Sequence, residues 1–281
     1  MSAFEQLALA GEALRRTLVG AFAPALWGPW LALGLLQGAV LAALVGFAHP
    51  LLAWALVPLV ERVGGESALH YPDFFRALPV LYARVDLVVG GLAGAVAAGW
   101  STWLFAARWR GGVVSPGAGW REAGPRALVL VVAQLPFQFL ALGLNGFLGR
   151  LLAGHTGLVV LAGYLVGLAG VVVLQAFFLY LPARIVLERR GLAAAFASLP
   201  ETWSRGFWAA LLLGTVLALP LLPLDQLGRR VGLLVDRGIP ELAIALTAAQ
   251  LLVTLVVSFL LTGSATLVYL GAVAGREEKR S

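Results

Sequence analysis

The residues that could carry out chemistry are few in this chain of 281 residues. Cysteine is absent, which excludes disulfides, thiolate metal sites and cysteine nucleophiles. The three histidines, His49, His70 and His155, do not show the spacing of a metal-binding pair on one helix. The sequence also contains no phosphate-binding loop, no Ser-His-Asp pattern and no nucleotide-binding fingerprint. We therefore expect neither a cofactor nor a metal.

Four polar residues between positions 70 and 86 form one candidate site: His70, Asp73, Arg84 and Asp86. A charged side chain at the bilayer centre costs about 2.5–3.5 kcal/mol on insertion scales, so charges at depth mark function. Arg84 and Asp86 come closest to such a position, at the outer end of the second apolar stretch. If the four side chains converge, they could support an intramembrane enzyme acting at the outer leaflet.

Uncharged polar residues inside the apolar stretches form a second candidate group. Several recur at a spacing of four residues, which places them on one face of a helix. Such side chains can hydrogen-bond between helices, or they can line a path for a polar solute, and the sequence leaves both interpretations open. The group consists of Gln134, Gln138, Gln175, Thr254, Ser258 and Thr262.

The elements that carry these residues follow from six stretches without Asp, Glu, Lys or Arg. A helix needs about 20 apolar residues to cross a bilayer, because it rises about 1.5 Å per residue through about 30 Å of hydrocarbon. Only 12% of the residues are charged, whereas a soluble domain carries about 25%. The sequence therefore predicts an all-α polytopic membrane protein with six spans. We place these spans near residues 27–48, 87–107, 127–149, 154–183, 206–224 and 242–273.

The segments between the spans complete a single integral membrane domain over residues 1–281. Apolar residues at helical spacing predict an amphipathic helix over residues 3–18, lying in the membrane interface. Residues 49–86 are predicted to be an extracytoplasmic loop that includes a further amphipathic surface helix. The alternation of lead segments and spans suggests three hairpin-like units in chain order, over residues 3–107, 111–187 and 191–275.

Pairs of glycines four residues apart suggest where helices approach closely. Small residues let helix backbones come together in lipid, where the hydrophobic effect does not drive helix association. We expect such faces to pack within the chain, with a homodimer face as the alternative. The pairs are Gly90 with Gly94 and Gly163 with Gly167.

The distribution of charge predicts the orientation. If the segments outside the spans are assigned to alternate sides, one side has thirteen Lys and Arg and the other has seven. Each side has seven acidic residues, so the net charge of +6 lies on one face. Because basic residues stay in the cytoplasm, both termini should be cytoplasmic, and that face should attract anionic lipid headgroups rather than nucleic acid. The strong preference for Arg over Lys suggests a GC-rich bacterial genome, and hence a multi-pass protein of the inner membrane.

Residues 182–208 contain a recognisable pattern of a proline at the end of a span, a glycine and an alanine-rich turn, and an Arg-Gly pair followed by aromatic residues. It comprises Pro182, Arg184, Glu188, Gly191, Leu192, Ala195, Phe196, Arg205, Gly206, Phe207 and Trp208. The pattern resembles the membrane domain of bacterial glycerophosphodiester phosphodiesterases and related six-helix membrane proteins. The chain departs from it at Pro200, where a serine is expected. Because the catalytic part of that family is a separate soluble domain, the resemblance implies an architecture and not a reaction.

Three hypotheses about function follow. The first is a non-enzymatic scaffold or accessory subunit that binds partner membrane proteins, lipids or a second copy of the chain. The second is a permease or carrier for a small solute or lipid, with the polar residues of the spans along its route. The third, which we rank last, is the intramembrane enzyme at the outer leaflet.

Overall fold

The protein is an all-α polytopic membrane protein. In the computed structural model, which describes residues 1–273, the fold is 85% helical and those residues form no β-strand. Five helical segments are long and apolar enough to cross a membrane. A sixth span exists if a pair of helices interrupted at residues 219–220 is counted as one. The predicted fold class is thus confirmed.

The chain divides into two compact units, each assembled from segments that lie far apart in the sequence. The first unit comprises residues 1–29, 95–218 and those from Ser258 onward, and the second comprises residues 30–94 and 219–257. These units differ from the three hairpin-like units predicted in chain order. Hydropathy indicates where helices lie along the chain, but it does not specify which helices contact one another.

The first unit contains most of the helices and its own apolar core. Its elements are α1 (Ala3–Gly20), the 3-10 helix η1 (Pro24–Trp27), α5 (Pro116–Ala123), the 3-10 helix η3 (Gly124–Arg126), α6 (Ala127–Leu151), α7 (Leu158–Phe178), α8 (Leu181–Val186), α9 (Leu192–Ala197), α10 (Leu199–Ala218) and the π-helix η4 (Tyr269–Val273), together with the last parts of α4 (Phe74–Trp109) and α13 (Leu242–Val268). One core cluster joins α6, α8, α9 and the start of α10 through Leu130, Ile185, Ala195 and Leu199.

Helix α1 is held in the first unit by small side chains. A capping box begins it: the Ser2 hydroxyl accepts from the Glu5 N–H, and the Glu5 carboxylate accepts from the Ser2 N–H. The helix packs against α10, and Ala10 and Ala13 are fully buried, whereas Phe4 is 81% exposed. The sequence predicted a helix lying in the membrane interface, and it did not predict which side would contact the protein. Small residues face the protein, because they allow a closer approach of the two helices.

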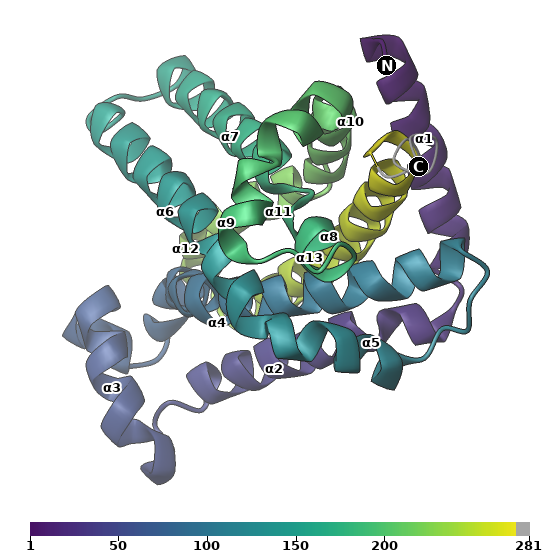
Figure 1. The fold of residues 1–281 in the computed structure, drawn as a ribbon. Helices are drawn as coiled ribbons and strands as arrows, with labels where there is room; N and C mark the ends of the chain where they lie inside the picture. The colour runs from purple at the N-terminus through teal and green to yellow at the C-terminus, as the bar shows by residue number, and fades with distance from the viewer. Residues whose placement is uncertain (274–281) are drawn as a thin grey trace. The chain divides into compact units, whose positions relative to one another are not determined.

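Helices α6 and α7 run side by side as an antiparallel hairpin (Figure 1). Leucines of α6 and of the turn after it occupy the space above the glycines of α7. A Cβ on Gly167 would lie 2.8 Å from Leu148 Cδ1, and one on Gly163 would clash with Leu152. Both glycines of this pair therefore serve packing within the chain.

The second unit contains the helices around the region predicted as a loop. Its elements are most of α2 (Gly28–Val45), then α3 (Pro50–Gly64), the 3-10 helix η2 (Glu66–Leu69), the first part of α4 (Phe74–Trp109), α11 (Leu221–Arg229), α12 (Val231–Asp236) and the first part of α13 (Leu242–Val268). A small core cluster consists of Val231, Val235 and Ala243.

Residues 49–86 are mostly helical, and the helix predicted in their second half is continuous with the helix of the second predicted span. Helix α4 starts at Phe74, and it runs without a break into the uncharged stretch that begins at residue 87. The sequence placed the start of the span at the end of the charged residues. A helix continues through charged positions such as Arg76 and Arg84, because its hydrogen bonds lie within the backbone and its side chains point outward.

Candidate functional site

A fully buried arginine joins three elements of the first unit. Arg184 in α8 is only 1% exposed. Its Nη1 donates to both carboxylate oxygens of Glu188, at 3.1 and 3.0 Å, and its Nε and Nη2 donate to the Thr202 hydroxyl of α10, at 3.3 and 3.0 Å. The guanidinium carbon lies 5.4 Å from the centroid of the Tyr269 ring in η4.

The Arg184 charge is fully paired. All three guanidinium nitrogens make hydrogen bonds, and a second carboxylate, that of Glu201, lies 3.8 Å from Nη2. Glu188 also forms an ion pair with Arg190. Because removal of one partner of such a buried set leaves an uncompensated charge, the network holds α8, α10 and η4 in one arrangement.

A buried tyrosine supports the same junction. The Tyr180 hydroxyl donates to the Gly206 carbonyl at 2.8 Å. A Cβ on Gly206 would lie 3.0 Å from the Tyr180 ring, so the ring uses the space that the glycine leaves. Gly206, the glycine of the Arg-Gly pair singled out in the sequence, therefore has a packing role in α10.

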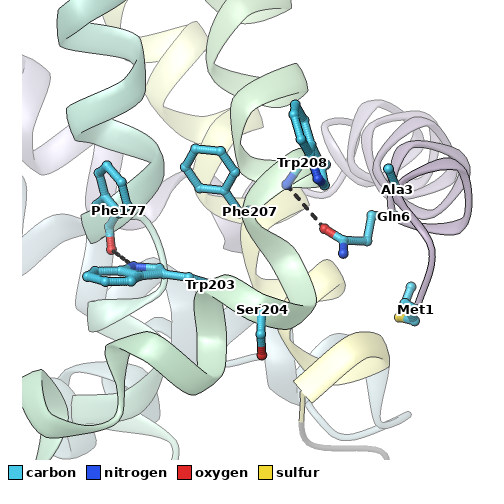
Figure 2. Close-up of a pocket in the computed structure, with 8 residues that line it drawn as sticks. All are labelled: Met1, Ala3, Gln6, Phe177, Trp203, Ser204, Phe207 and Trp208. Atoms are coloured by element: carbon cyan, nitrogen blue, oxygen red, sulfur yellow. Dashed lines mark hydrogen bonds between the residues drawn. The ribbon is translucent and has the colours of Figure 1, made fainter.

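An aromatic pocket lies beside this junction, between α1, α7 and α10 (Figure 2). Its volume is about 460 Å³, within the range of about 300–1,000 Å³ that is usual for small-molecule sites. Its lining consists of Met1, Ala3, Gln6, Phe177, Trp203, Ser204, Phe207 and Trp208. We call this site the aromatic pocket.

Three polar groups in the wall of the aromatic pocket are bonded to the protein. Trp203 Nε1 donates to the Phe177 carbonyl at 3.0 Å, and the buried Gln6 accepts from the Trp208 backbone N–H at 3.1 Å (Figure 2). The Ser204 hydroxyl donates to the Glu201 carbonyl at 2.8 Å. What the pocket offers to a guest is therefore mainly aromatic surface.

The aromatic rings of the pocket form a continuous series. Phe177 contacts Trp203 edge-on with the centroids 4.6 Å apart, and it lies 5.3 Å from Phe207. The ring centroid of Phe207 lies 5.8 Å from that of Trp208, and Trp208 is 48% exposed. An exposed ring at the rim can change its packing when a guest binds.

A second buried polar arrangement lies in the second unit, where α2 and α4 contribute one residue each. Gln37 Nε2 donates to Asp86 Oδ1 at 2.7 Å. Gln37 is 5% exposed, and its Oε1 has no hydrogen-bond partner among residues 1–273. The buried Tyr82 hydroxyl, one helical turn before Asp86, also lacks a partner within the described part of the chain. We call Gln37, Tyr82 and Asp86 the carboxyl–amide site.

Gly90 makes room for the carboxyl–amide site. A Cβ at Gly90 would lie 2.7 Å from Asp86 Cγ and 2.8 Å from Gln37 Nε2. At Gly94 the nearest atom would be Leu33 Cδ2 at 3.9 Å, which is an ordinary contact. The two glycines of this pair therefore differ. At Gly90 the missing side chain leaves room for polar groups, whereas at Gly94 there is room for a Cβ.

Exposed polar pairs join the start of α4 to α12 and α13. Arg76 Nη2 lies 2.6 Å from Asp236 Oδ1, and Arg76 Nε lies 3.1 Å from Asp73 Oδ1. The Tyr71 hydroxyl donates to Glu241 Oε1 at 3.1 Å. The negative charge of Glu241 raises the pKa of Tyr71 above its usual value, because the hydrogen bond requires the protonated phenol.

The predicted cluster of His70, Asp73, Arg84 and Asp86 does not form one site. Asp73 precedes α4 and pairs with Arg76, whereas Asp86 lies about 18 Å further along that helix at about 1.5 Å per residue. Arg84 and His70 are exposed. Across residues 1–273, no three His, Asp or Glu side chains come together in a way that could hold a metal ion.

The predicted polar path is spread over three helices. Gln134 and Gln138 lie on α6, Gln175 lies on α7, and Thr254, Ser258 and Thr262 lie on α13. All six are half-buried. Gln175 lies near α10, with its Oε1 3.9 Å from where a Cβ on Gly214 would be. A route for a solute along these residues stays a prediction.

Comparison with known proteins finds no matching family model, no matching curated protein and no matching solved structure. The resemblance of residues 182–208 to the phosphodiesterase membrane domain therefore stays a prediction.

The sequence pattern included Arg184 without giving it a role, and Gln37 belonged to neither candidate group. The spacing of four residues between Arg184 and Glu188 was the available signal for the first. A glutamine in α2 and an aspartate in α4 gave no signal that they meet, because the sequence does not state which helices are neighbours.

Proposed function

We propose that the protein is a non-enzymatic integral membrane protein that binds membrane lipid in the aromatic pocket and acts as a scaffold or accessory subunit. The observation that carries the proposal is the chemistry of the pocket wall. Three of its polar groups, Trp203 Nε1, Gln6 Oε1 and the Ser204 hydroxyl, are engaged within the protein, and four of its eight lining residues are aromatic. Such a wall binds a guest by burying apolar surface and offers little to activate a reacting group.

The energetics favour a lipid chain as the guest. A lipid chain that enters the pocket leaves hydrocarbon and not water, so its affinity comes from the dispersion contacts that its methylene groups make with the aromatic rings. Tryptophan rings also prefer the headgroup level of a membrane, where an apolar ring and a polar N–H both find partners. Exposed arginines on α1, Arg15 and Arg16, would add attraction for anionic headgroups near the same helix.

The test is the amount of phospholipid that stays bound during purification. Trp208→Ala removes the exposed ring at the rim of the pocket, and we expect it to reduce bound lipid several-fold when measured by mass spectrometry. The matched control is Trp54→Ala, which removes a ring that is 81% exposed on α3 and does not line the pocket. Equal lipid content in the wild type and in both variants would contradict the proposal.

We also propose that the protein lies in a bacterial inner membrane with both termini in the cytoplasm. The support is the thirteen-to-seven division of Lys and Arg between the two predicted sides. Three of the thirteen, Arg276, Lys279 and Arg280, lie outside the described residues. Reporter enzymes that are active on one side of the membrane, fused to each terminus, should both indicate the cytoplasm, and opposite results would overturn this topology.

A scaffold needs helix faces that are free to contact partner proteins, and only some faces of this chain are free. Gly163 and Gly167 are covered by leucines of the same chain, so this pair is not free to contact a second copy. Exposed apolar side chains such as Phe139 and Phe147 on α6 remain available to lipid or to another membrane protein.

A carrier is the second candidate, and the Asp86–Gln37 contact favours it. Ionisable residues inside spans commonly mark the routes of transported ions and substrates. If the protein moves lipid between leaflets, proteoliposomes should expose a fluorescent phospholipid of the inner leaflet to an external quencher. Replacement of Gln134 and Gln138 by leucine should then abolish this movement, whereas a scaffold would show none in either form.

A further inference from the structure

The carboxyl–amide site contains an acidic side chain inside a segment that is long and apolar enough to span a membrane. Asp86 lies in α4, and its carboxyl group is half-buried. The contact that compensates it is a neutral one, the hydrogen bond from Gln37 Nε2 at 2.7 Å. An ionised carboxylate in such a place needs a positive charge, because burial in a low dielectric disfavours it.

The same site contains two buried oxygen atoms that have no hydrogen-bond partner in the described part of the chain. Gln37 Oε1 is buried without a hydrogen-bond partner among residues 1–273, and it belongs to the amide that already contacts Asp86. Within the described chain the Tyr82 hydroxyl is likewise buried and unpartnered, and it precedes Asp86 by one turn of α4. Buried polar atoms are nearly always satisfied, so an unpartnered oxygen on the amide that contacts Asp86 and a second one on the preceding turn of α4 require an explanation.

A bound cation provides that explanation. All the available ligand atoms are oxygens: two from a carboxylate, one from an amide and one from a phenol. Oxygen ligands select hard cations such as those of sodium, magnesium or calcium. One carboxylate neutralises a single positive charge, whereas a divalent ion would leave a net positive charge among apolar helices.

We propose that the carboxyl–amide site binds a monovalent hard cation, with sodium as the probe ion. Asp86 supplies the charge, and Gln37 Oε1 and the Tyr82 hydroxyl supply neutral oxygens from α2 and α4. Gly90 leaves room for the carboxyl, because any side chain there would collide with it. The site lies in the second unit, and the inference does not depend on lipid binding in the aromatic pocket of the first.

The experiment follows the melting temperature of the purified full-length protein as sodium replaces N-methylglucamine at constant ionic strength. A ligand that binds only the folded state stabilises it, and a sodium concentration ten times the dissociation constant should raise the melting temperature by about 3–6 °C. Asp86→Asn should abolish this rise. The matched control is Asp236→Asn, which removes an exposed carboxylate of the same unit and should leave the rise intact.

Tyr82→Phe keeps the proposal testable if Asp86→Asn does not fold. Loss of one neutral oxygen should raise the half-saturating sodium concentration by about tenfold, without loss of the folded protein. A sodium response that is the same in the wild type and in both variants would overturn the proposal. So would stabilisation by low pH alone without any response to sodium, since this would assign a proton to Asp86 in place of a metal ion.

Discussion

Arg184 in the first unit and Asp86 in the second are both ionisable side chains within apolar helical segments, and their surroundings differ. Every guanidinium nitrogen of Arg184 makes a hydrogen bond, two carboxylates lie near it, and an aromatic ring covers its plane. Asp86 is compensated by one neutral amide. A charge with a complete set of partners stabilises the fold, whereas a charge with a neutral partner leaves a place for a ligand.

Replacement of the central residue of the first network should give the largest effect. Arg184→Ala removes the buried charge to which Glu188 and Thr202 are bonded and leaves a cavity between α8 and α10, and we expect a loss of about 3–5 kcal/mol in the free energy of unfolding. Unfolding in detergent, followed by tryptophan fluorescence, measures it. Arg15→Ala removes an exposed arginine and should change little. Similar stability of the two variants would show that the buried Arg184 contributes no more to the fold than the exposed Arg15.

Glycine substitutions in α4 should sharpen the comparison in the second unit. Gly90→Ala places a methyl group against Asp86 and Gln37, and this overpacking should cost about 1–3 kcal/mol. Gly94→Ala has room for the methyl group and should be neutral or stabilising by up to about 1 kcal/mol, because alanine favours the helix. The same unfolding assay compares them, and a larger loss at Gly94 would show that the carboxyl–amide site does not depend on Gly90.

Two tyrosines allow a matched test with a smaller effect. Tyr180→Phe removes the hydrogen bond to the Gly206 carbonyl and should cost about 1 kcal/mol. In sodium-free buffer Tyr82→Phe should cost nothing, since its buried hydroxyl has no partner within residues 1–273. If Tyr82→Phe proves the more destabilising of the two, the hydroxyl has a protein partner and the comparison fails.

The exposed ion pairs of α1 should give the smallest effect, and it should depend on pH. Hydrogen bonds from Arg15 and Arg16 lower the pKa of Glu12 from its usual 4.5 to about 2. Because the folded pKa is lowered, the stability that this pairing adds is present above about pH 5 and is lost as the pH falls towards 2. The difference in melting temperature between the wild type and Glu12→Gln should therefore be larger at pH 7 than at pH 3. A difference that does not change with pH would show that Glu12 acts through packing.

Much of the fold could be predicted from the sequence, because the bilayer limits what an apolar chain can do. A spanning segment must satisfy its own backbone hydrogen bonds, so long uncharged stretches become helices. The predicted interfacial helix over residues 3–18 corresponds to α1. The boundaries were less accurate where charged residues continue a helix, as they do at the start of α4.

The candidate sites were harder to predict, because each depends on contacts between residues far apart in the chain. Gln37 and Asp86 are separated by 49 positions, and Gln6 and Trp208 by 202. The cluster predicted from neighbouring positions, His70 to Asp86, is instead drawn out along a helix. Proximity in sequence was therefore a poor guide to proximity in space.

The sequence by itself determined that the protein is a membrane protein and that its fold is all-α, since hydrophobicity and the spacing of charges are local properties of each segment. Only the tertiary structure decided which helices meet, and hence which polar groups are satisfied. The side chains that bond to Arg184 come from separate helices, and so do those that line the aromatic pocket and those that surround the unpartnered oxygen of Gln37. Their pairing is set by the packing of small and large side chains between helices, which no single segment specifies.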